Sequence, residues 1–177
     1  MASPTIEKLL KTKSKNIENF KKLNWTGSFD DYLKIVYDNP KTPRNSYQRL
    51  YDMVMSHGVS KFTYCKREYT TYNFFSTGDD IAIFGLEEQL MEFVDVIKSA
   101  AKGYGPERRI ILLHGPVGSA KSTIVTQLKK GLEKYSETEE GALYSFSWLI
   151  PKDDDPEMME VIDCPMNEEP LKLLPIE

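Results

Sequence analysis

Apolar residues recur every three to four positions over much of the first hundred residues, which is the spacing of amphipathic helices. This pattern predicts four helices, over residues 4–20, 29–39, 43–57 and 86–101. Ser28 suits the N-cap of the second helix, because Asp31 follows three residues later and completes an approximate capping box. The N-terminal third of the chain is therefore predicted to be mainly helical.

Strand-like patterns appear in the middle and second half of the chain. Residues Ile110–Leu113 form a continuous apolar run, typical of a parallel strand that is covered on both faces. Residues 142–150 alternate aromatic residues with serines, which predicts another strand with one face toward a core. The segment 61–75 is rich in Tyr, Thr and Phe and fits either short strands or an ordered aromatic loop. Beyond Pro151, prolines and acidic residues predict an extended, weakly structured tail.

A loop of small residues, Gly-Pro-Val-Gly-Ser-Ala-Lys-Ser over residues 115–122, lies between the apolar run and a helix-like segment. That is the setting of a phosphate-binding loop, in which backbone amides turn toward the β-phosphate and the helix N-terminus adds positive potential. Lys121 stands where the lysine reaches the β and γ oxygens, and Ser122 where a hydroxyl binds Mg²⁺. The plain alternative is a strand-to-helix turn whose serine only caps the helix.

One position departs from the usual G-x-x-x-x-G-K-[ST] pattern, because Ala120 replaces the final glycine. We expect the alanine to be tolerated at a negative φ, as at a first helical residue, where its methyl group avoids the phosphates. Ser119 and Thr123 fit phosphate contacts and helix capping equally well. The residues predicted to bind the nucleotide here are Gly115, Pro116, Val117, Gly118, Ser119, Ala120, Lys121, Ser122 and Thr123, with Ser122 as the Mg²⁺ ligand.

Length and charge narrow the class of protein. The 177 residues suffice for one domain with a sizeable core, and the formal net charge is -4. Lysines concentrate in the first 22 residues and acidic residues after residue 152, which argues against nucleic-acid binding by the acidic end. The two cysteines, Cys65 and Cys164, form no disulfide or metal motif, and no apolar run is long enough to cross a bilayer. We therefore expect a cytoplasmic protein with neither a membrane nor a nucleic acid as partner.

Three segments together resemble the PrkA-type serine protein kinase family: residues 83–88, 114–123 and 140–148. Residues 29–33, 44–53 and 164–170 are also similar to the N-terminal half of that family. The resemblance implies an AAA-type ATPase domain that uses ATP and Mg²⁺, followed by a kinase-like region that phosphorylates protein serine. It also implies a protein substrate and a homo-oligomer, and it places Ile83, Phe84 and Gly85 near the adenine.

The resulting prediction is an α/β fold with a partial P-loop NTPase-like (AAA-type) core. Residues 1–60 would form a helical region, 61–150 the nucleotide-binding core and 151–177 an acidic, proline-containing tail. No apolar run ending in Asp-Glu follows the loop, so catalytic residues stay unassigned and the chain is expected to bind ATP with little turnover. Two alternatives stay open: an AAA-type ATPase that drives protein remodelling or proteolysis, and a nucleotide-sensing module that does not hydrolyse ATP.

Overall fold

The computed structural model describes residues 24–76, 82–152 and 158–175. The chain groups into two compact units, one formed by Arg44–Gly141 and the other by Met1–Pro43 together with Ala142–Glu177. The helix predicted over residues 4–20 lies outside the described residues. The division of the chain at residues 60 and 150 stays a prediction, and the two units are described separately below.

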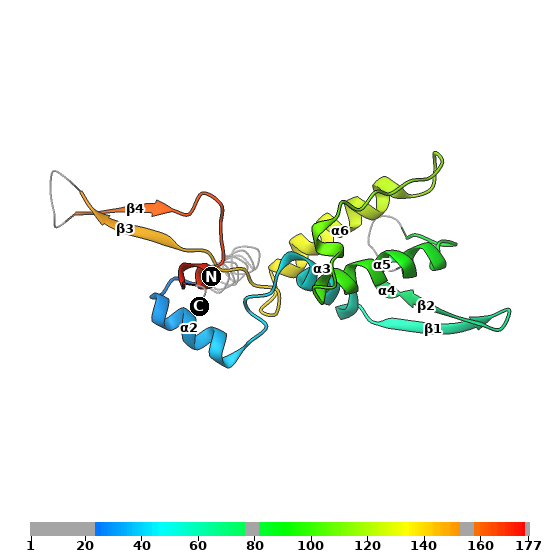
Figure 1. Ribbon diagram of the computed structural model, residues 1–177, viewed down its shortest axis with the longest axis horizontal. Coiled ribbons are helices and arrows are strands. Elements are labelled where there is room, and N and C mark those ends of the chain that lie inside the picture. Colours follow the sequence, from blue (N-terminus) through cyan, green and yellow to red (C-terminus); the bar gives the residue numbers. More distant parts are fainter. Residues whose placement is uncertain (1–23, 77–81, 153–157, 176–177) are drawn as a thin grey trace, which may run out of the picture. The chain divides into compact units, whose positions relative to one another are not determined.

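The unit Arg44–Gly141 consists of helices and one β-hairpin (Figure 1). Its elements are α3 (Ser46–Ser56), β1 (Val59–Tyr64), β2 (Arg67–Tyr72), α4 (Asn73–Ser76), α5 (Glu87–Ala101), the 3₁₀ helix η1 (Pro106–Arg108) and α6 (Lys121–Ser136). The segment that the sequence left open thus contains a hairpin, in which β1 and β2 pair antiparallel with Val59 opposite Tyr72.

Local sequence explains where α3 begins and ends. The Asn45 side chain accepts a hydrogen bond from the Gln48 amide at 2.8 Å, and the Gln48 side chain accepts one from the Asn45 amide at 2.9 Å. This reciprocal capping box starts the helix at Ser46, three residues after the predicted start at Pro43. Gly58, at φ 86°, supplies the left-handed turn into β1.

The core of this unit lies where α5 packs against α3 and β2, and α6 packs against α3. Its largest fully buried side chains are Met53, Val54, Phe75, Val94 and Ile97. Backbone approach is close at Gly131 on α6, because a Cβ atom there would lie 2.6 Å from the Phe74 ring. Glycine at this position allows α6 to pack directly onto the core.

Two arginines join α3 to the chain that leaves α6. The Arg44 guanidinium donates to the Asp52 carboxylate and to the carbonyl of Glu140. The Arg49 guanidinium donates to the carbonyl of Gly141. Both guanidiniums lie over the Tyr135 ring, 5.9 and 6.0 Å from its centroid. These charged hydrogen bonds satisfy carbonyls just beyond the C-terminus of α6.

The second unit contains α2 (Phe29–Asp38), β3 (Ser147–Pro151), β4 (Met159–Asp163) and the 3₁₀ helix η2 (Pro170–Leu173). The capping box predicted at Ser28 and Asp31 is confirmed, and hydrogen bonds from Lys34 and Ser28 lower the pKa of Asp31 to about 2. The buried Tyr32 of α2 donates its hydroxyl proton to the Glu169 carboxylate, which ties α2 to the start of η2.

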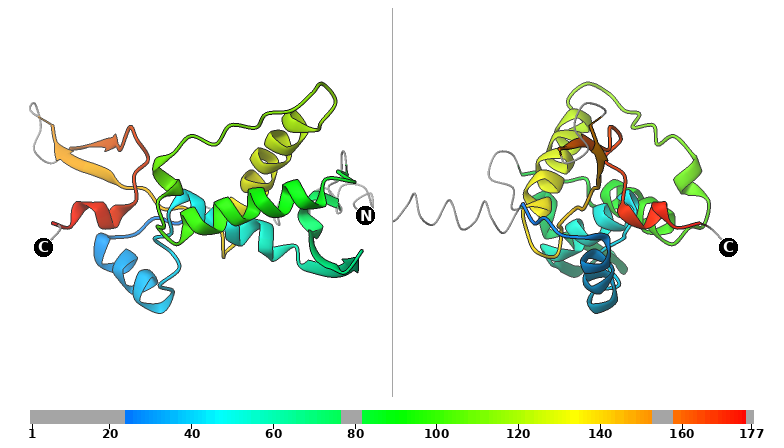
Figure 2. Two further views of the ribbon diagram at one scale, coloured as in Figure 1. Left: turned by 45° about the vertical axis from the view of Figure 1, so that its right-hand side comes forward. Right: turned by 90° about the vertical axis from the view of Figure 1, so that its left-hand side faces the viewer.

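Two predictions about strands are wrong. Residues Ile110–Leu113 form no strand, and Ile110 and Leu112 are 96% and 82% exposed, so the run is not a buried parallel strand (Figure 2). The described residues form only two sheets, both two-stranded and antiparallel, so none of them gives the run a partner. The region beyond Pro151 is not merely an extended tail, because Met159–Asp163 pairs with Ser147–Pro151 as β4. The predicted strand over 142–150 is present only from Ser147 onward.

Helices and strands are thus both present, which fits the predicted α/β class, whereas the parallel P-loop core itself stays a prediction. Within the described ranges, no helix combines the length and apolar character needed to cross a membrane.

Candidate phosphate-binding loop

The loop 115–120 leads directly into α6, which begins at Lys121, so the helix-like segment predicted after the loop is confirmed as a helix (Figure 2). Gly118 has φ 85°, a left-handed conformation that glycine adopts at little cost. Ala120 has φ 53° and stands as the N-cap of α6, so the prediction of a negative φ at this alanine is wrong. A left-handed alanine costs about 1–2 kcal/mol, which explains why glycine is usual at this position of such loops.

The ammonium group of Lys121 lies inside the turn of the loop. Its Nζ donates to the carbonyl oxygens of Gly115 at 2.8 Å and Pro116 at 2.6 Å, and to Ser119 Oγ at 2.8 Å. An ammonium has three protons, so these three acceptors use all of its donors. The loop is therefore folded around its own lysine.

Gly115 and Ser119 determine how tightly the loop closes. The Ser119 hydroxyl donates to the Pro116 carbonyl at 2.8 Å. A Cβ atom on Gly115 would lie 2.8 Å from Ser119 Oγ, so the Ser119 side chain would have to move, and 3.9 Å from Lys121 Nζ, which is ordinary contact. The absence of a side chain at Gly115 thus leaves room for the Lys121 ammonium and the Ser119 hydroxyl. The Ser119 hydroxyl forms its hydrogen bonds within the loop, to the Pro116 carbonyl and to Lys121.

The amides at the start of α6 are available to a ligand. The first N–H groups of any α-helix have no acceptor within the helix. Among the described residues, the amides of Gly118, Ala120, Lys121 and Ser122 donate to no acceptor, whereas Ser119 donates weakly to Pro116 at 3.4 Å. The Ser122 hydroxyl is exposed in the first turn of the helix. These donors fit an anionic group, because the helix dipole also favours negative charge at this end.

The charged side chains around the loop are all basic over a long stretch of sequence. No acidic residue stands between Glu107 and Glu133, and this interval carries Arg108 and Arg109 before the loop and Lys121 within it. Such a distribution raises the local concentration of phosphate-bearing ligands. Within the described parts of the chain, no group of three or more His, Cys, Asp or Glu residues could hold a metal ion. The three aspartates at 153–155, in the predicted acidic tail, lie outside the described residues.

The C-terminal end of the loop is anchored on the core. Ala120 packs against the same cluster of buried residues that contains Ile124 of α6 and Ile83. The predicted adenine segment, Ile83–Gly85, therefore shares a core with the first turns of α6. Within it Ile83 is buried, whereas the Phe84 ring is 76% exposed.

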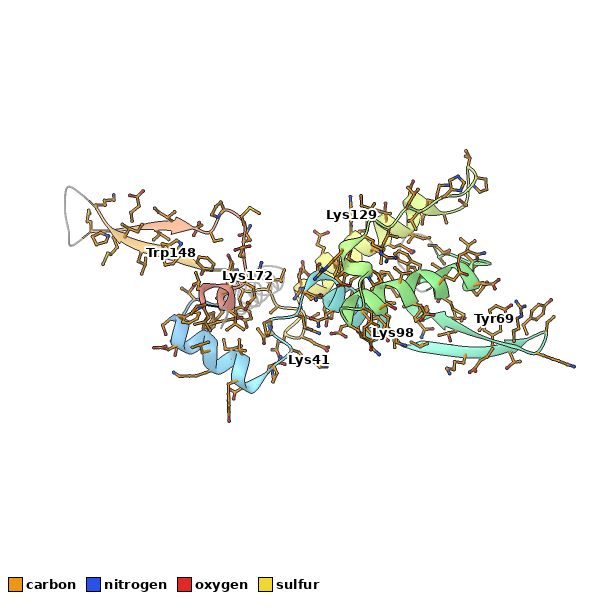
Figure 3. All side chains as sticks on the ribbon, viewed as in Figure 1. Lys41, Tyr69, Lys98, Lys129, Trp148 and Lys172 are labelled. Carbon is orange, nitrogen blue, oxygen red and sulfur yellow. The ribbon has the colours of Figure 1, made fainter. Side chains whose placement is uncertain are left out.

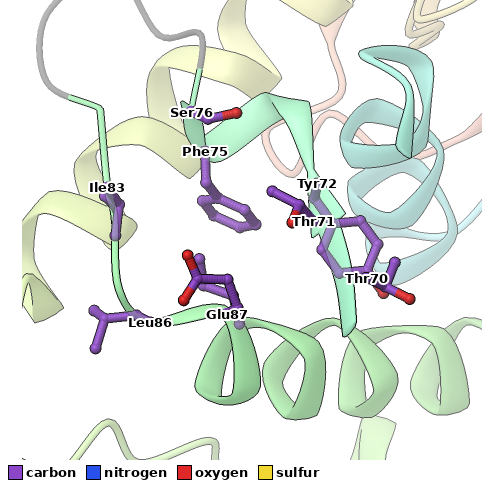
Figure 4. A pocket seen from close by; sticks show the side chains of 9 residues that line it. Thr70, Thr71, Tyr72, Phe75, Ser76, Ile83, Leu86 and Glu87 are labelled. Atoms are coloured by element: carbon purple, nitrogen blue, oxygen red, sulfur yellow. The ribbon is translucent and has the colours of Figure 1, made fainter. Parts of the chain in front are cut away.

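A pocket beside Ile83 is too small to hold a base. Strand β2, α4 and the start of α5 line it with residues that include Tyr72, Phe75, Leu86 and Glu87 (Figure 4). The space inside it is about 10 Å³, which is no more than one water molecule needs. An adenine therefore does not fit inside this pocket, and the placement of Ile83–Gly85 near the adenine stays a prediction.

Comparison with known proteins shows which family the chain belongs to. The family described as the PrkA AAA domain matches residues 27–177. The chain belongs to the PrkA AAA domain family. It is 38% identical over 168 residues to the "ATP-dependent protease PrkA" of Bacillus subtilis (strain 168), which covers 94% of this chain and 23% of that relative. The chain thus spans about a quarter of the length of this curated relative, and the resemblance to PrkA-type proteins drawn from the sequence is confirmed.

A second relative of this PrkA domain is shorter. The "Uncharacterized protein in gldA 5'region" of Geobacillus stearothermophilus is 32% identical over 103 residues, which cover 58% of this chain and 98% of that protein. No solved structure matches the chain. Membership of a family of AAA domains implies nucleotide binding, and the geometry of residues 115–123 offers the donors for it.

Proposed function

We propose that residues 115–123 bind the phosphates of Mg-ATP and that the PrkA protein carrying this domain uses ATP to drive protein degradation. The observation that carries the first part is the Lys121 ammonium, which lies inside a turn whose following amides have no acceptor among the described residues. The second part is supported by the name of the Bacillus subtilis relative, an ATP-dependent protease.

In this proposal Lys121 exchanges neutral partners for charged ones. Its three present acceptors are two carbonyls and a hydroxyl, whereas phosphate oxygens would form charge-assisted hydrogen bonds that are about twice as strong. The amides of Gly118, Ala120 and Ser122 would donate to the β-phosphate, and the Ser122 hydroxyl would hold Mg²⁺. Bound Mg²⁺ would neutralise part of the phosphate charge.

The proposal is tested by replacing Lys121 and measuring Mg-ATP binding by calorimetry. Lys121→Ala removes a charged donor that makes at least two phosphate contacts, each worth about 1.5–3 kcal/mol, so affinity should fall by about 10²–10⁴. The matched control is Lys129→Ala on α6, because Lys129 is exposed and lies two helical turns beyond the loop. Circular dichroism establishes that both variants are folded. Undiminished affinity of folded Lys121→Ala would remove the lysine from the site.

The role of Ser122 is tested through the metal. In the wild-type chain, Mg²⁺ should tighten ATP binding, and Ser122→Ala should abolish most of that gain while leaving the affinity for metal-free ATP nearly unchanged. Thr126→Ala is the control, because Thr126 is exposed one turn further along α6. An equal loss of affinity with and without Mg²⁺ would assign Ser122 to phosphate binding or capping instead.

Three activities are distinguished by one set of assays with Mg-ATP. ATP-dependent release of fluorescence from labelled casein, absent with a non-hydrolysable analogue and absent in Lys121→Ala, would support proteolysis. Transfer of ³²P from labelled ATP to protein serine, lost in the same variant, would instead support the serine-kinase activity that the resemblance to PrkA-type kinases predicted. Tight ATP binding with neither activity would support a nucleotide-sensing module.

A further inference from the structure

The β3–β4 hairpin carries apolar side chains that nothing covers among the described residues. Six of them are 45–66% exposed: Trp148, Leu149, Ile150, Met159, Val161 and Ile162. Scattered apolar residues are normal at a protein surface, but a contiguous group on one small element marks a contact site. Side chains project from both sides of this ribbon, with Trp148 near its middle (Figure 3).

The strand register places apolar pairs on both faces of the hairpin. Trp148 is opposite Ile162, and the neighbouring pair is Leu149 opposite Val161. Since successive residues of a strand point to opposite faces, the first pair lies on one face and the second pair on the other. An isolated two-stranded hairpin is marginally stable in water, so these strands gain from being covered.

The charges of the hairpin indicate a basic occupant. Glu160 and Asp163 of β4 are exposed, and Asp163 also accepts a hydrogen bond from Ser147 Oγ at 2.7 Å. Lys152 is the one basic residue among the described residues of the hairpin, 147–152 and 158–163. An apolar surface edged by carboxylates is complementary to an amphipathic segment that carries lysines.

We propose that the β3–β4 hairpin docks residues 4–22 of this same chain as an amphipathic helix. This segment lies outside the described residues, and its sequence has apolar residues at helical spacing: Ile6, Leu9, Leu10, Ile17 and Phe20. Lysines fill the positions between and after them: Lys8, Lys11, Lys13, Lys15, Lys21 and Lys22. The segment therefore offers an apolar stripe for the apolar face of the hairpin and lysines that complement its carboxylates.

The point at which the segment joins the described chain favours this occupant. The Trp25 ring contacts the Tyr144 ring edge-on, with centroids 5.6 Å apart, and Tyr144 stands three residues before the start of β3. The described chain begins at residue 24, one residue before this contact, so the segment joins the chain beside the residues that lead into β3. A helix of this length measures about 28 Å, and a five-residue strand about 17 Å, so one helix is long enough to cover one of the two faces of the hairpin from end to end.

Hydrogen–deuterium exchange on the full chain tests the proposal from the helix side. The double variant Leu9→Gln, Leu10→Gln removes the centre of the apolar stripe and keeps the lysines. Exchange of the amides in 147–151 and 159–163 should rise at least tenfold over the wild-type chain. The control Thr12→Gln, Ser14→Gln changes two polar residues of the same segment and should leave the exchange of the hairpin unchanged. Equal exchange in the double variant and the wild type would overturn the proposal.

A second variant tests the contact from the hairpin side. Leu149→Gln with Trp148→Gln makes one exposed residue of each face polar and should raise exchange in residues 4–22 at least tenfold. Exchange is repeated at two protein concentrations tenfold apart. Protection of the hairpin that grows with concentration and survives Leu9→Gln, Leu10→Gln would show a second copy as the occupant and would overturn the intramolecular contact.

Discussion

Both hairpins of the chain are antiparallel, but they differ in how they are packed. The β1–β2 hairpin joins the core at its base, although Phe62 and Tyr64 nearer its turn are 44% and 67% exposed, whereas every residue of β3 and β4 is exposed. At the open end of the β1–β2 hairpin, Val59 and Tyr72 are opposite each other and pack on the core. Strand β2 also contacts α5, and Lys61 forms a cross-strand ion pair with Glu68 at 3.0 Å. In β3–β4 the central pairs are aliphatic or aromatic on both faces and are about half exposed. One hairpin is anchored by its own unit at the pair Val59 and Tyr72, whereas both strands of the other are left exposed by the described residues.

The same difference separates the two compact units. The unit Arg44–Gly141 holds the main cluster of buried residues, from Met53 through Phe75 and Val94 to Ile124. In the other unit, the buried residues among the described ones are few: Tyr32, Cys164 and Pro170. Substitutions inside the first unit should therefore reduce stability far more than substitutions of similar size on the second.

The largest effect is expected at Phe75, which is 1% exposed in α4, directly after the β1–β2 hairpin. Phe75→Ala should lower the free energy of unfolding by about 3–5 kcal/mol, because it removes buried apolar surface and leaves a cavity. Tyr37→Ala on α2 is the matched control, since Tyr37 is 87% exposed, and it should change stability by less than about 0.5 kcal/mol. Urea unfolding measures both. Similar losses for the two variants would contradict the contrast between the units.

Sequence patterns predicted the helices of the well-packed unit closely. The apolar spacing over 86–101 matches α5 at Glu87–Ala101, and the helix after the loop begins at Lys121. Helix α3 begins three residues after the predicted start at Pro43, because the capping pair of Asn45 and Gln48 determines where it starts. Helices were predictable because their periodicity and caps are local in sequence.

Strands were predicted less well because their pairing is not local. The run Ile110–Leu113 has the composition of a buried strand, yet no described strand pairs with it. Conversely, β4 lies in a segment rich in acidic residues and prolines, whose sequence does not predict a strand. It is recognised as a strand only by its antiparallel pairing with β3. At the loop, the sequence identified Gly118, Lys121 and Ser122 as candidates, but it did not indicate that Ala120 is left-handed or that Lys121 bonds to the loop's own carbonyls.

An intermediate effect is expected at Gly131, where α6 approaches the core. Alanine favours a helix over glycine by about 1 kcal/mol, so on propensity alone Gly131→Ala would stabilise α6. The new Cβ atom would instead lie 2.6 Å from the buried Phe74 ring and 3.0 Å from Met53 Sδ. Overpacking of this kind should lower the free energy of unfolding by about 1–3 kcal/mol, as measured by urea unfolding.

A double-mutant cycle sharpens this prediction. Phe74→Leu shortens the side chain that the new methyl group would meet, so Gly131→Ala should cost less in the Phe74→Leu background than in the wild type. A stabilising Gly131→Ala would mean that the core of the unit Arg44–Gly141 can expand to accept a methyl group, which would weaken the contrast between the tightly packed unit and its neighbour.

The smallest effect is expected at Tyr32, which ties α2 to η2 in the unit with few buried residues. Tyr32→Phe keeps the buried ring and removes the hydroxyl that donates to Glu169. The Glu169 carboxylate also accepts from the Leu171 amide at 3.0 Å, so it keeps a partner after the change. The loss in the free energy of unfolding should therefore be about 1 kcal/mol at neutral pH, the usual contribution of one hydrogen bond.

The pH dependence provides a second measurement for the same variant. Burial, and then the hydrogen bond to Glu169, raise the pKa of Tyr32 above its ordinary value in the folded chain. As pH rises past about 10, the unfolded chain therefore loses this proton before the folded chain does, and the stabilisation from neutral Tyr32 declines. Tyr32→Phe should weaken the alkaline loss of stability, whereas Tyr37→Phe, at an exposed site on the same helix, should preserve it. An unchanged alkaline slope in Tyr32→Phe would mean that the contact between α2 and η2 does not hold this hydroxyl in solution.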